Sequence, residues 1–158
     1  MKKLRLVATG GTFDCIHIGH IKLLSTAFNT GNQVIIGLTS DEFVKKYKST
    51  SNIINNYETR YQNLNEKILE HFKYVKYNII KLEDEFGPVL SSPLIEAIIV
   101  SEETLVKVKD INKIRITNCL KPLKIEVVKI AKSEDGQPIS STRIRKGEID
   151  GNGNILRK

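Results

Sequence analysis

The sequence predicts an α/β fold with one doubly wound, five-stranded parallel sheet and helices on both faces. Short apolar runs alternate with longer segments in which apolar residues recur every three or four positions, a pattern typical of strands alternating with helices. The first strand, helix and strand fit within residues 4–39, as expected for a right-handed parallel unit. No repeat, linker or compositional break divides the 158 residues, so we expect residues 1–158 to form a single domain that folds alone.

The N-terminal half begins with an apolar strand at Leu4–Thr9. The next segment, Ile18–Thr30, has its apolar residues on one helical stripe, and Gly31 is a typical helix stop. Gln33–Thr39 is rich in aliphatic and β-branched residues and is the second predicted strand. The sequence SDEF then starts a short helical turn, and the polar stretch KSTSNIINN at 48–56 predicts a loop.

The C-terminal half continues the alternation. A helix is predicted over Asn56–Phe72, because its large apolar side chains share one face and Asn55 with Glu58 has the spacing of a capping box. The apolar spacing also predicts a helix over Glu103–Leu120. The remaining predicted strands are Tyr77–Glu83, Glu96–Ser101 and Lys124–Ile130.

The net charge of +7 and the isoelectric point near 9.4 favour an anionic partner: nucleic acid, a membrane surface or a phosphorylated small molecule. The lysines are scattered and aromatic residues make up only 6% of the chain, so nucleic acid is not expected. No apolar run approaches the roughly 20 residues that span a bilayer, so no membrane partner is expected either. The start MKKLRLVATGG resembles a signal peptide, but Arg5 interrupts its apolar part, and we interpret it as a strand. Cys15 and Cys119 form no disulfide framework, which favours the cytoplasm.

The sequence ATGGTFDCIHIGH at 8–20 follows the first strand directly. Gly10 and Gly11 have no Cβ, so they allow a sharp turn and a close approach to a ligand. Thr12 adds a hydroxyl group and Asp14 a carboxylate. These residue types, in a loop at the carboxyl end of a strand, predict a binding site.

The same stretch ends at the start of a helix. His17 and His20 are three residues apart, so their side chains can lie on one side of the first helical turn. Gly19 between them is expected to keep the backbone open to a bulky anion. The free N–H groups and the dipole at a helix start attract phosphate. A zinc site made by Cys15, His17 and His20 is an alternative, but only three close candidates exist. The dinucleotide pattern G-x-G-x-x-G is absent from the loop.

A second motif, PISSTRIRKG at 138–147, also predicts an anion site. With Ser140 as N-cap, Ile139 and Ile144 have the spacing of a hydrophobic staple, and Gly147 ends the helix. The hydroxyl and guanidinium groups for an anion would come from Ser140, Ser141, Thr142 and either Arg143 or Arg145. The structural alternative is a well-capped helix with solvent-exposed arginines.

Together the two motifs resemble a known superfamily. GGTFDCIHIGH is similar to the signature of the HxGH nucleotidyltransferases, which have a Rossmann-like fold, and ISSTRIR is similar to their ISSTxIR motif. Class I aminoacyl-tRNA synthetases share a similar histidine motif, but this chain is too short for one and lacks a KMSKS-like segment.

Further stretches resemble the archaeal branch of phosphopantetheine adenylyltransferases, which is related to the eukaryotic coenzyme A enzymes. They are IGLTSDEFVKK (36–46), NYETR (56–60), LEDEFGP (82–88), IVSEET (99–104), EDGQPISSTRIRKGEID (134–150) and the spacing of Ile111, Asn112 and Arg115. The sequence departs from the family at 105–108, where the family usually has a glycine and small residues.

The resemblance implies transfer of the adenylyl group of ATP to 4'-phosphopantetheine, which gives dephospho-coenzyme A and pyrophosphate in coenzyme A biosynthesis. Mg²⁺ is expected with the ATP, held largely by phosphate oxygens and water, and no protein metal site is expected. By resemblance the ATP-binding residues are Gly10, Gly11, Thr12, His17, His20, Ser141, Thr142 and Arg143. The catalytic residues among them would be His17, His20, Thr12 and Arg143. The motifs give no information on the oligomeric state.

Within this set, His20 would stabilise the reacting α-phosphate most directly, and Thr12 would bind both reacting phosphates. Lys45, Lys46 and Arg60 are candidates for the acceptor phosphate, with surface ion pairs as the alternative. Glu102 and Glu103 are candidates for the adenine pocket, although glutamates that cap the next helix would give the same pattern. Other HxGH enzymes, such as an FAD synthetase or a small-alcohol-phosphate cytidylyltransferase, and a non-catalytic nucleotide or nucleic-acid binder, are the alternative functions.

Overall fold

The computed structural model describes residues 2–47 and 55–157. The predicted loop at 48–56 therefore lies mostly outside the described residues. The five strands within the described residues form one parallel sheet in the order β3-β2-β1-β4-β5, so β1 lies in the middle and the strand order reverses beside it. This topology confirms the predicted doubly wound α/β fold. The strands are β1 (Leu4–Gly11), β2 (Gly31–Thr39), β3 (Tyr77–Leu82), β4 (Ala97–Ser101) and β5 (Lys124–Val128).

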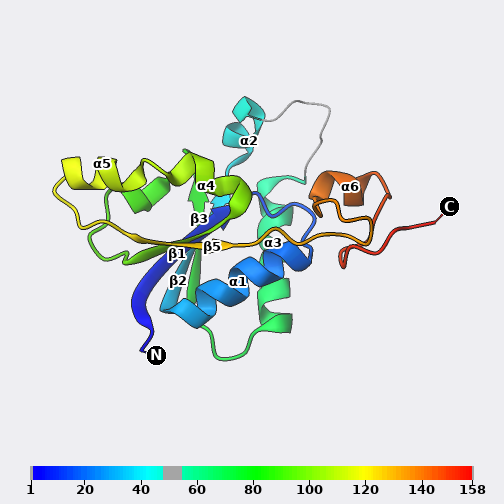
Figure 1. Ribbon diagram of the computed structural model, residues 1–158, viewed down its shortest axis with the longest axis horizontal. Helices are drawn as coiled ribbons and strands as arrows, with labels where there is room; N and C mark the ends of the chain where they lie inside the picture. The colour runs from blue at the N-terminus through cyan, green and yellow to red at the C-terminus, as the bar shows by residue number, and fades with distance from the viewer. Residues whose placement is uncertain (1, 48–54, 158) are drawn as a thin grey trace.

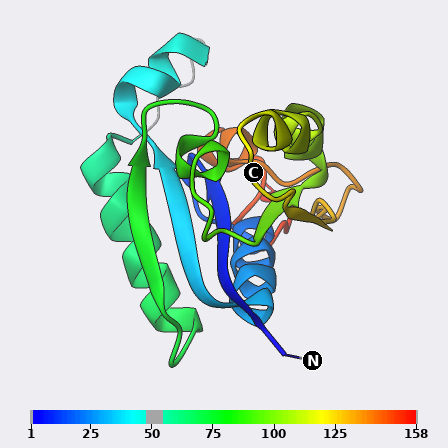
Figure 2. The ribbon, with the colours of Figure 1, turned by 90° about the vertical axis from the view of Figure 1, so that its left-hand side faces the viewer.

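Helices cover both faces of the sheet (Figures 1 and 2). The helices are α1 (Ile18–Thr30), α2 (Asp41–Tyr47), α3 (Tyr57–His71), α4 (Glu102–Val108), α5 (Ile111–Thr117) and α6 (Ser141–Arg145), with a 3₁₀ turn η1 at Gly87–Leu90. On one face α1 and α3 pack their apolar stripes on the central strands, through residues such as Leu24 and Ile68. On the other face α4, α5 and η1 pack through residues such as Val108, Ile111 and Val89. Burial of these side chains against the sheet is the main source of stability.

Beyond β5 the chain leaves the sheet and returns to the start of α1. A small third cluster of Ala131, Ile139, Ile144 and Ile149 holds the residues around α6 together. Gly151 then accepts a hydrogen bond through its carbonyl from the backbone N–H of Ile18, at 2.9 Å. The C-terminal segment thereby places α6 beside the first turn of α1.

The glycines of the first motif act differently from the prediction. Gly10 and Gly11 continue β1, and a Cβ on Gly10 would lie 3.0 Å from the carbonyl oxygen of Gly37 on β2. Gly10 is thus needed for the close approach of two strands. The turn instead falls at Phe13, which has a left-handed φ of 47° and a buried ring.

Two other predictions need correction. The helix expected over 103–120 is divided into α4 and α5 at Asp110, a residue type that favours helix caps over helix interiors. The predicted capping box of Asn55 and Glu58 is wrong, because Asn56 is the N-cap of α3 and its side chain accepts a hydrogen bond from Thr59 N–H. Asn55 instead binds Asp14.

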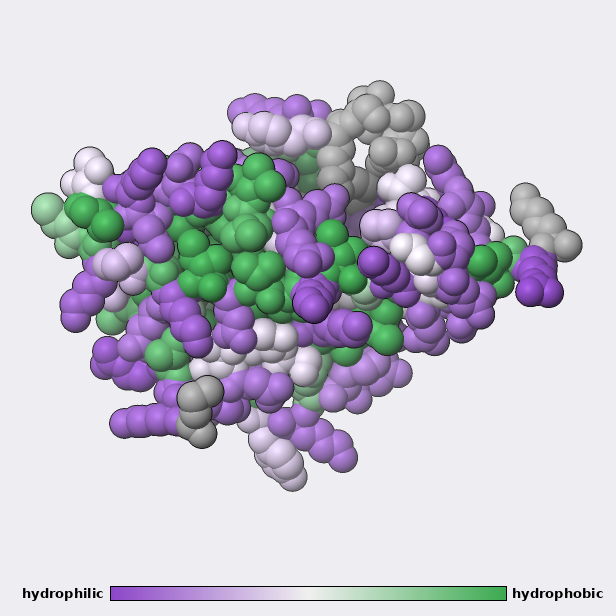
Figure 3. All heavy atoms as spheres, viewed as in Figure 1, coloured by the Kyte–Doolittle hydropathy of each residue, from purple (hydrophilic) through white to green (hydrophobic). Residues whose placement is uncertain are grey.

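The face of Figure 1 carries exposed apolar side chains. Figure 3 shows apolar surface gathered where α4 and β5 lie in Figure 1. The exposed apolar residues of these two elements include Leu105, Val106 and Val127. Within the described residues, no helix is long and apolar enough to cross a membrane.

Candidate active site

A cavity of about 580 Å³ lies at the carboxyl ends of the strands, where the strand order reverses. Ligands of open parallel sheets collect at this place. The predicted residues that line the cavity are Gly10, Gly11, Thr12, His17, His20, Glu103, Ser141 and Thr142. The structure therefore brings the two sequence motifs together on one cavity.

The two histidines sit at the first turn of α1 with their rings stacked, 3.8 Å between centroids. Gly19 donates its backbone N–H to Nδ1 of His17 at 3.1 Å, and His17 donates its own N–H to Nδ1 of His20 at 3.2 Å. Because a backbone N–H can only donate, both Nδ1 atoms accept, and each neutral ring carries its proton on Nε2. The capping box of α1 thus sets the tautomer of both histidines.

Burial lowers the pKa of His17 to about 4. His17 is therefore neutral near pH 7, and it contributes an N–H donor rather than a positive charge. Its folded-back ring also explains Gly19, since a Cβ there would lie 2.9 Å from the His17 ring atoms Cε1 and Nδ1. The sequence interpretation left room at Gly19 for an anion, whereas the structure uses that room for the His17 ring.

Ser141 joins the two motifs through the backbone of Cys15. Its hydroxyl group accepts a hydrogen bond from Cys15 N–H at 3.2 Å and donates one to Cys15 C=O at 3.1 Å. As predicted, Ser140 is the N-cap of α6, and its side chain accepts from Arg143 N–H. The hydroxyl group of Ser141 is thus already engaged in holding α6 against the first motif.

Asp14 is a second connection between the motifs. Its carboxylate accepts from Nη1 of Arg145, and from the backbone and side-chain amides of Asn55, each at 2.9 Å. Arg145 also donates through Nη2 to the hydroxyl group of Thr142 at 3.2 Å. Arg145 lines the cavity, so it is the arginine of α6 that faces the candidate site.

Arg143 lies away from the cavity lining. Its guanidinium group binds Asp135 at 2.6 Å, Glu148 at 3.0 Å and the Ser133 hydroxyl group at 2.8 Å. The hydrogen bonds from Ser133, the Gln137 backbone and Arg143 hold the pKa of Asp135 at about 2. Arg143 therefore ties the 133–138 turn to α6, and its expected phosphate contact stays a prediction.

The acceptor-phosphate candidates lie apart from one another. Lys45 and Lys46 are exposed on α2 and do not line the cavity, unlike Phe43 and Tyr47 of the same helix. Arg60 is fully buried beneath the cavity, and its side chain donates to protein groups.

The adenine candidates have different surroundings. Glu103 lines the cavity, whereas Glu102 accepts a hydrogen bond from Ile130 N–H at 3.1 Å and so ties α4 to the end of β5. Lys107 and Lys129 add positive charge to this part of the lining. Glu102 and Glu103 both lie in the first turn of α4, where carboxylates also stabilise the helix dipole.

The sequence interpretation missed the apolar end of the cavity. Phe43 and Tyr47 of α2 line it together with Ile80 and Leu82 of β3 and Phe86 before η1. The alternation of β3 and the helical spacing in α2 give only a burial pattern, which is the same for a core and for an apolar ligand wall. Only the three-dimensional arrangement distinguishes the two.

In the part of the chain that the structure describes, no cluster of metal ligands accompanies this arrangement. Within residues 2–47 and 55–157, no three His, Cys, Asp or Glu side chains are placed to hold a metal ion. The zinc alternative with Cys15, His17 and His20 therefore has no support. Burial raises the pKa of the Cys15 thiol, and a thiol with a raised pKa is a poor nucleophile and a poor ligand near pH 7.

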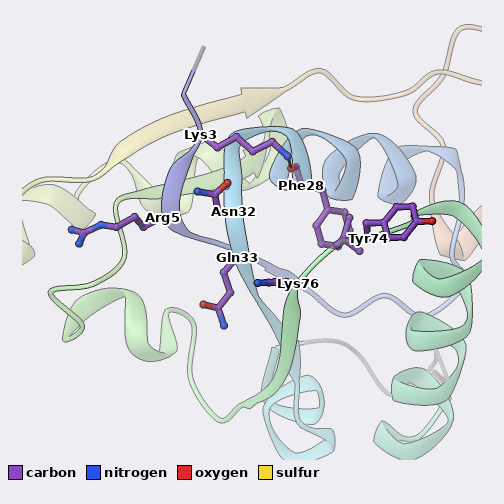
Figure 4. A pocket seen from close by; sticks show the side chains of 9 residues that line it. Lys3, Arg5, Phe28, Asn32, Gln33, Tyr74 and Lys76 are labelled. Atoms are coloured by element: carbon purple, nitrogen blue, oxygen red, sulfur yellow. Dashed lines mark hydrogen bonds between the residues drawn. The ribbon is translucent and has the colours of Figure 1, made fainter.

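A second depression of about 490 Å³ lies at the opposite, amino ends of β1–β3. Figure 4 shows Lys3 reaching Phe28, and the Lys3 ammonium group donates a hydrogen bond to the Phe28 carbonyl at 2.8 Å. Arg5 points away from Phe28 and Tyr74. The cations here do not converge on one point, unlike the groups of the first cavity.

Comparison with known proteins identifies the family. Residues 8–147 match the family model described as cytidylyltransferase-like. A phosphopantetheine adenylyltransferase of Methanothermobacter thermautotrophicus is 41% identical over 99% of this chain and 93% of its own length. The enzyme of the same name from Pyrococcus furiosus is 45% identical over 99% of this chain and 97% of its own.

Solved structures support the fold. A protein from Archaeoglobus fulgidus, described as of unknown function, has a TM-score of 0.70 at 26% identity and covers 79% of this chain and 89% of its own. A pantoate-beta-alanine ligase from Francisella tularensis has a TM-score of 0.57 at 16% identity, over 92% of this chain and 66% of its own. The chain belongs to the cytidylyltransferase-like family and, within it, to the phosphopantetheine adenylyltransferases of the type found in these archaeal relatives.

Proposed function

We propose that the protein transfers the adenylyl group of ATP to 4'-phosphopantetheine, giving dephospho-coenzyme A and pyrophosphate. One observation carries the proposal: the two triphosphate motifs, far apart in the sequence, are joined by Ser141 and Arg145 into one cavity wall. The chain is also similar over nearly its whole length to enzymes named phosphopantetheine adenylyltransferase. The protein is thus a nucleotidyltransferase.

The chemistry needs little covalent work from the protein. An oxygen of the acceptor phosphate, already an anion, attacks the α-phosphorus of ATP, and the bond from that phosphorus to the bridging oxygen of the β-phosphate breaks. Pyrophosphate leaves with the electron pair. Catalysis then comes from positioning the two phosphates in line and from neutralising charge on the phosphoryl oxygens. This requirement fits a cavity rich in N–H and hydroxyl donors.

We assign the triphosphate to the start of α1. The Nε2–H groups of His17 and His20 would donate to phosphate oxygens, with His20 at the α-phosphate. Thr12, at the end of β1, would contact both reacting phosphates. From α6 the hydroxyl group of Thr142, the backbone N–H of Ser141 at the helix start and a guanidinium group would hold the β- and γ-phosphates. Arg143 is the arginine that the resemblance suggests for the β- and γ-phosphates. Arg145 is a second candidate, because it lines the cavity.

The two remaining ends of the cavity suit the two other parts of the substrates. The apolar end, with Phe43, Tyr47 and Phe86, offers a surface for the uncharged pantetheine arm. Lys45 and Lys46 on the same helix would add positive charge near the acceptor phosphate. On the far side of β1, Glu103 and the backbone near Lys129 would border the adenine.

Mg²⁺ is proposed to enter with ATP. The carboxylates on the cavity lining are Asp14, which is bound to Arg145, together with Glu85 and Glu103, and they do not form a cluster. Phosphate oxygens and water would therefore hold the ion, as is usual for Mg²⁺. The ion would neutralise phosphate charge, while the side chains above orient the reacting groups.

We place the reaction in the cytoplasm, because Cys15 and Cys119 are both free thiols, as expected in a reducing compartment. Small molecules are the proposed partners. The affinity for a polynucleotide would fall steeply as the salt concentration rises, whereas the affinity of a closed site for a small molecule should change less. Measuring ligand affinity at two salt concentrations therefore separates these two functions.

The proposal is tested by pyrophosphate release from purified protein with Mg²⁺. The reactions contain ATP alone, ATP with 4'-phosphopantetheine, ATP with FMN, and CTP with a small alcohol phosphate. We expect release only when ATP and 4'-phosphopantetheine are both present. Release with FMN or CTP would support the assigned phosphate site but would show that the acceptor or the donor is assigned wrongly. No release in any reaction would refute an enzymatic role.

A further inference from the structure

Arg60 is a charged side chain with 0% exposure, located in the first turns of α3. Its Nε donates to the carbonyl of Asn55 at 2.8 Å, and its Nη1 donates to the carbonyls of Thr12 at 3.1 Å and Thr39 at 2.8 Å. Its Nη2 donates to Asp41 at 3.0 Å. A guanidinium group buried at this cost is retained only where its hydrogen bonds are well satisfied.

Two of the residues that Arg60 binds, Thr12 and Thr39, belong to the cavity lining. Thr12 follows β1 and Thr39 ends β2, and both residues line the cavity while Arg60 does not. The Thr39 hydroxyl group also donates to the Thr12 hydroxyl oxygen at 3.2 Å. Arg60 therefore fixes the carbonyl of Thr12 directly and its hydroxyl group through Thr39.

The same side chain anchors α2. Asp41 opens α2, which brings Phe43 and Tyr47 to the apolar end of the cavity. Burial alone would raise the pKa of Asp41, but hydrogen bonds from the Tyr57 backbone and from Arg60 outweigh it and lower the pKa. The carboxylate of Asp41 is thus held in its charged form against Arg60 near pH 7.

We infer that Arg60 is a positioning residue: it aligns the Thr12 hydroxyl group with the reacting phosphates and holds α2 at the acceptor end, without touching the substrate. This inference rests on the proposed function for the role of Thr12. It replaces the acceptor-phosphate contact that the sequence suggested for Arg60, because the donors of Arg60 are directed to protein carbonyls and to Asp41.

The kinetic test is a double-mutant cycle between Arg60→Lys and Thr12→Ala. A lysine keeps the charge but cannot reach four groups with a planar fork. We expect Arg60→Lys to lower kcat about 10- to 100-fold and to change the KM for ATP less than about threefold. If Arg60 acts through Thr12, the double variant has the kcat of Thr12→Ala alone. Losses that multiply would overturn the inference, as would a change confined to the KM of the acceptor.

Arg115 supplies the matched control. It is a buried arginine that donates to the carbonyls of Lys121, Val89 and Ser92 on the opposite face of the sheet. Arg115→Lys should lower the melting temperature as Arg60→Lys does, yet leave kcat within about threefold of wild type. Equal losses of kcat in both variants at a temperature where both are folded would reduce Arg60 to a general stabilising role.

Hydrogen exchange tests the anchoring without any assay of activity. In Arg60→Lys we expect faster amide exchange at residues 12–14 and in α2, with α5 unchanged. In Arg115→Lys we expect faster amide exchange in α5, with residues 12–14 and α2 unchanged. A uniform increase over the whole chain would overturn the inference even if the wild-type protein proved inactive, and inactivity of the wild type would separately refute the proposed function.

Discussion

Asp14 and Arg145 are 131 residues apart in the sequence and form an ion pair at the base of the cavity. The Asp14 side chain is 2% exposed and that of Arg145 is 24% exposed, so water screens the pair only weakly. The pair joins the loop after β1 to α6, and Asn55 extends it to the start of α3. One carboxylate thereby positions three segments around the proposed triphosphate.

We predict that Asp14→Asn weakens both the fold and the reaction. The asparagine keeps an oxygen for Asn55 but leaves Arg145 without its charge partner, so the free energy of unfolding should fall by about 2 kcal/mol. Turnover should fall about 10- to 100-fold, because α6 loses its alignment with α1. Chemical denaturation and steady-state kinetics measure the two effects. Glu70→Gln, which breaks an exposed pair with Lys67, is the control, and equal behaviour of the two variants would refute the prediction.

The two arginines of α6 should differ in function. Because Arg145 lines the cavity and Arg143 binds Asp135 and Glu148, we predict that Arg145→Ala lowers kcat/KM for ATP roughly 10²-fold. Arg143→Ala should mainly loosen the 133–138 turn, which lowers the melting temperature. The comparison is made at a temperature where both variants are folded. A larger loss of kcat/KM in Arg143→Ala would instead support the phosphate contact expected from the sequence.

His20→Ala should lower kcat roughly 10²- to 10³-fold, the usual loss for one donor to a transition state, and leave ATP binding nearly unchanged. ATP affinity is measured by calorimetry and kcat by pyrophosphate release. His71→Ala is the matched control, because His71 lies exposed at the end of α3. Turnover of His20→Ala close to that of His71→Ala would remove His20 from the mechanism.

His17 should make the fold sensitive to acid. Its pKa is about 4 in the folded protein and near 6.5 in an unfolded chain, so the unfolded state binds a proton more readily between these values. Stability should therefore fall as the pH drops from about 6.5 to 4, by on the order of 2 kcal/mol. His17→Asn keeps a good N-cap acceptor without a titrating ring, so it should flatten this part of the profile. Denaturation at pH 7 and pH 4.5 gives the comparison, and parallel profiles would contradict the pKa shift.

Local signals in the sequence predicted local structure well. Ser140 as the N-cap of α6 and Gly31 as the stop of α1 depend only on neighbours within a few residues, and both are confirmed. The parallel orientation of the strands followed from the alternation of strands and helices. Asn55 shows the limit, because two adjacent asparagines offer the same cap and only the contact with Asp14 decides between them.

Pairings across the chain could not be predicted from spacing. In the sequence, Arg60 and Arg143 cannot be distinguished from a surface arginine or a phosphate-binding arginine. The structure shows that their guanidinium groups donate hydrogen bonds to other protein groups. The role of Gly10 also depends on a distant residue. A side chain is disfavoured at Gly10 because of the close carbonyl of Gly37 on the neighbouring strand, and not because of a ligand. Resemblance to the family predicted that the two motifs share one site, and residues of both motifs line the cavity, whereas the hydrogen bonds between the motifs required the structure.

The proposed reaction is a single direct displacement at the α-phosphorus, with no covalent protein intermediate. The most direct measurement is the configuration of the product made from 4'-phosphopantetheine and one diastereomer of ATP that carries sulfur on the α-phosphorus. Phosphorus NMR of the thio-substituted dephospho-coenzyme A should show inversion, because one in-line attack inverts the centre. Retention would require two displacements through an adenylylated side chain, and it would refute a single in-line attack, while the absence of product would refute the proposed reaction.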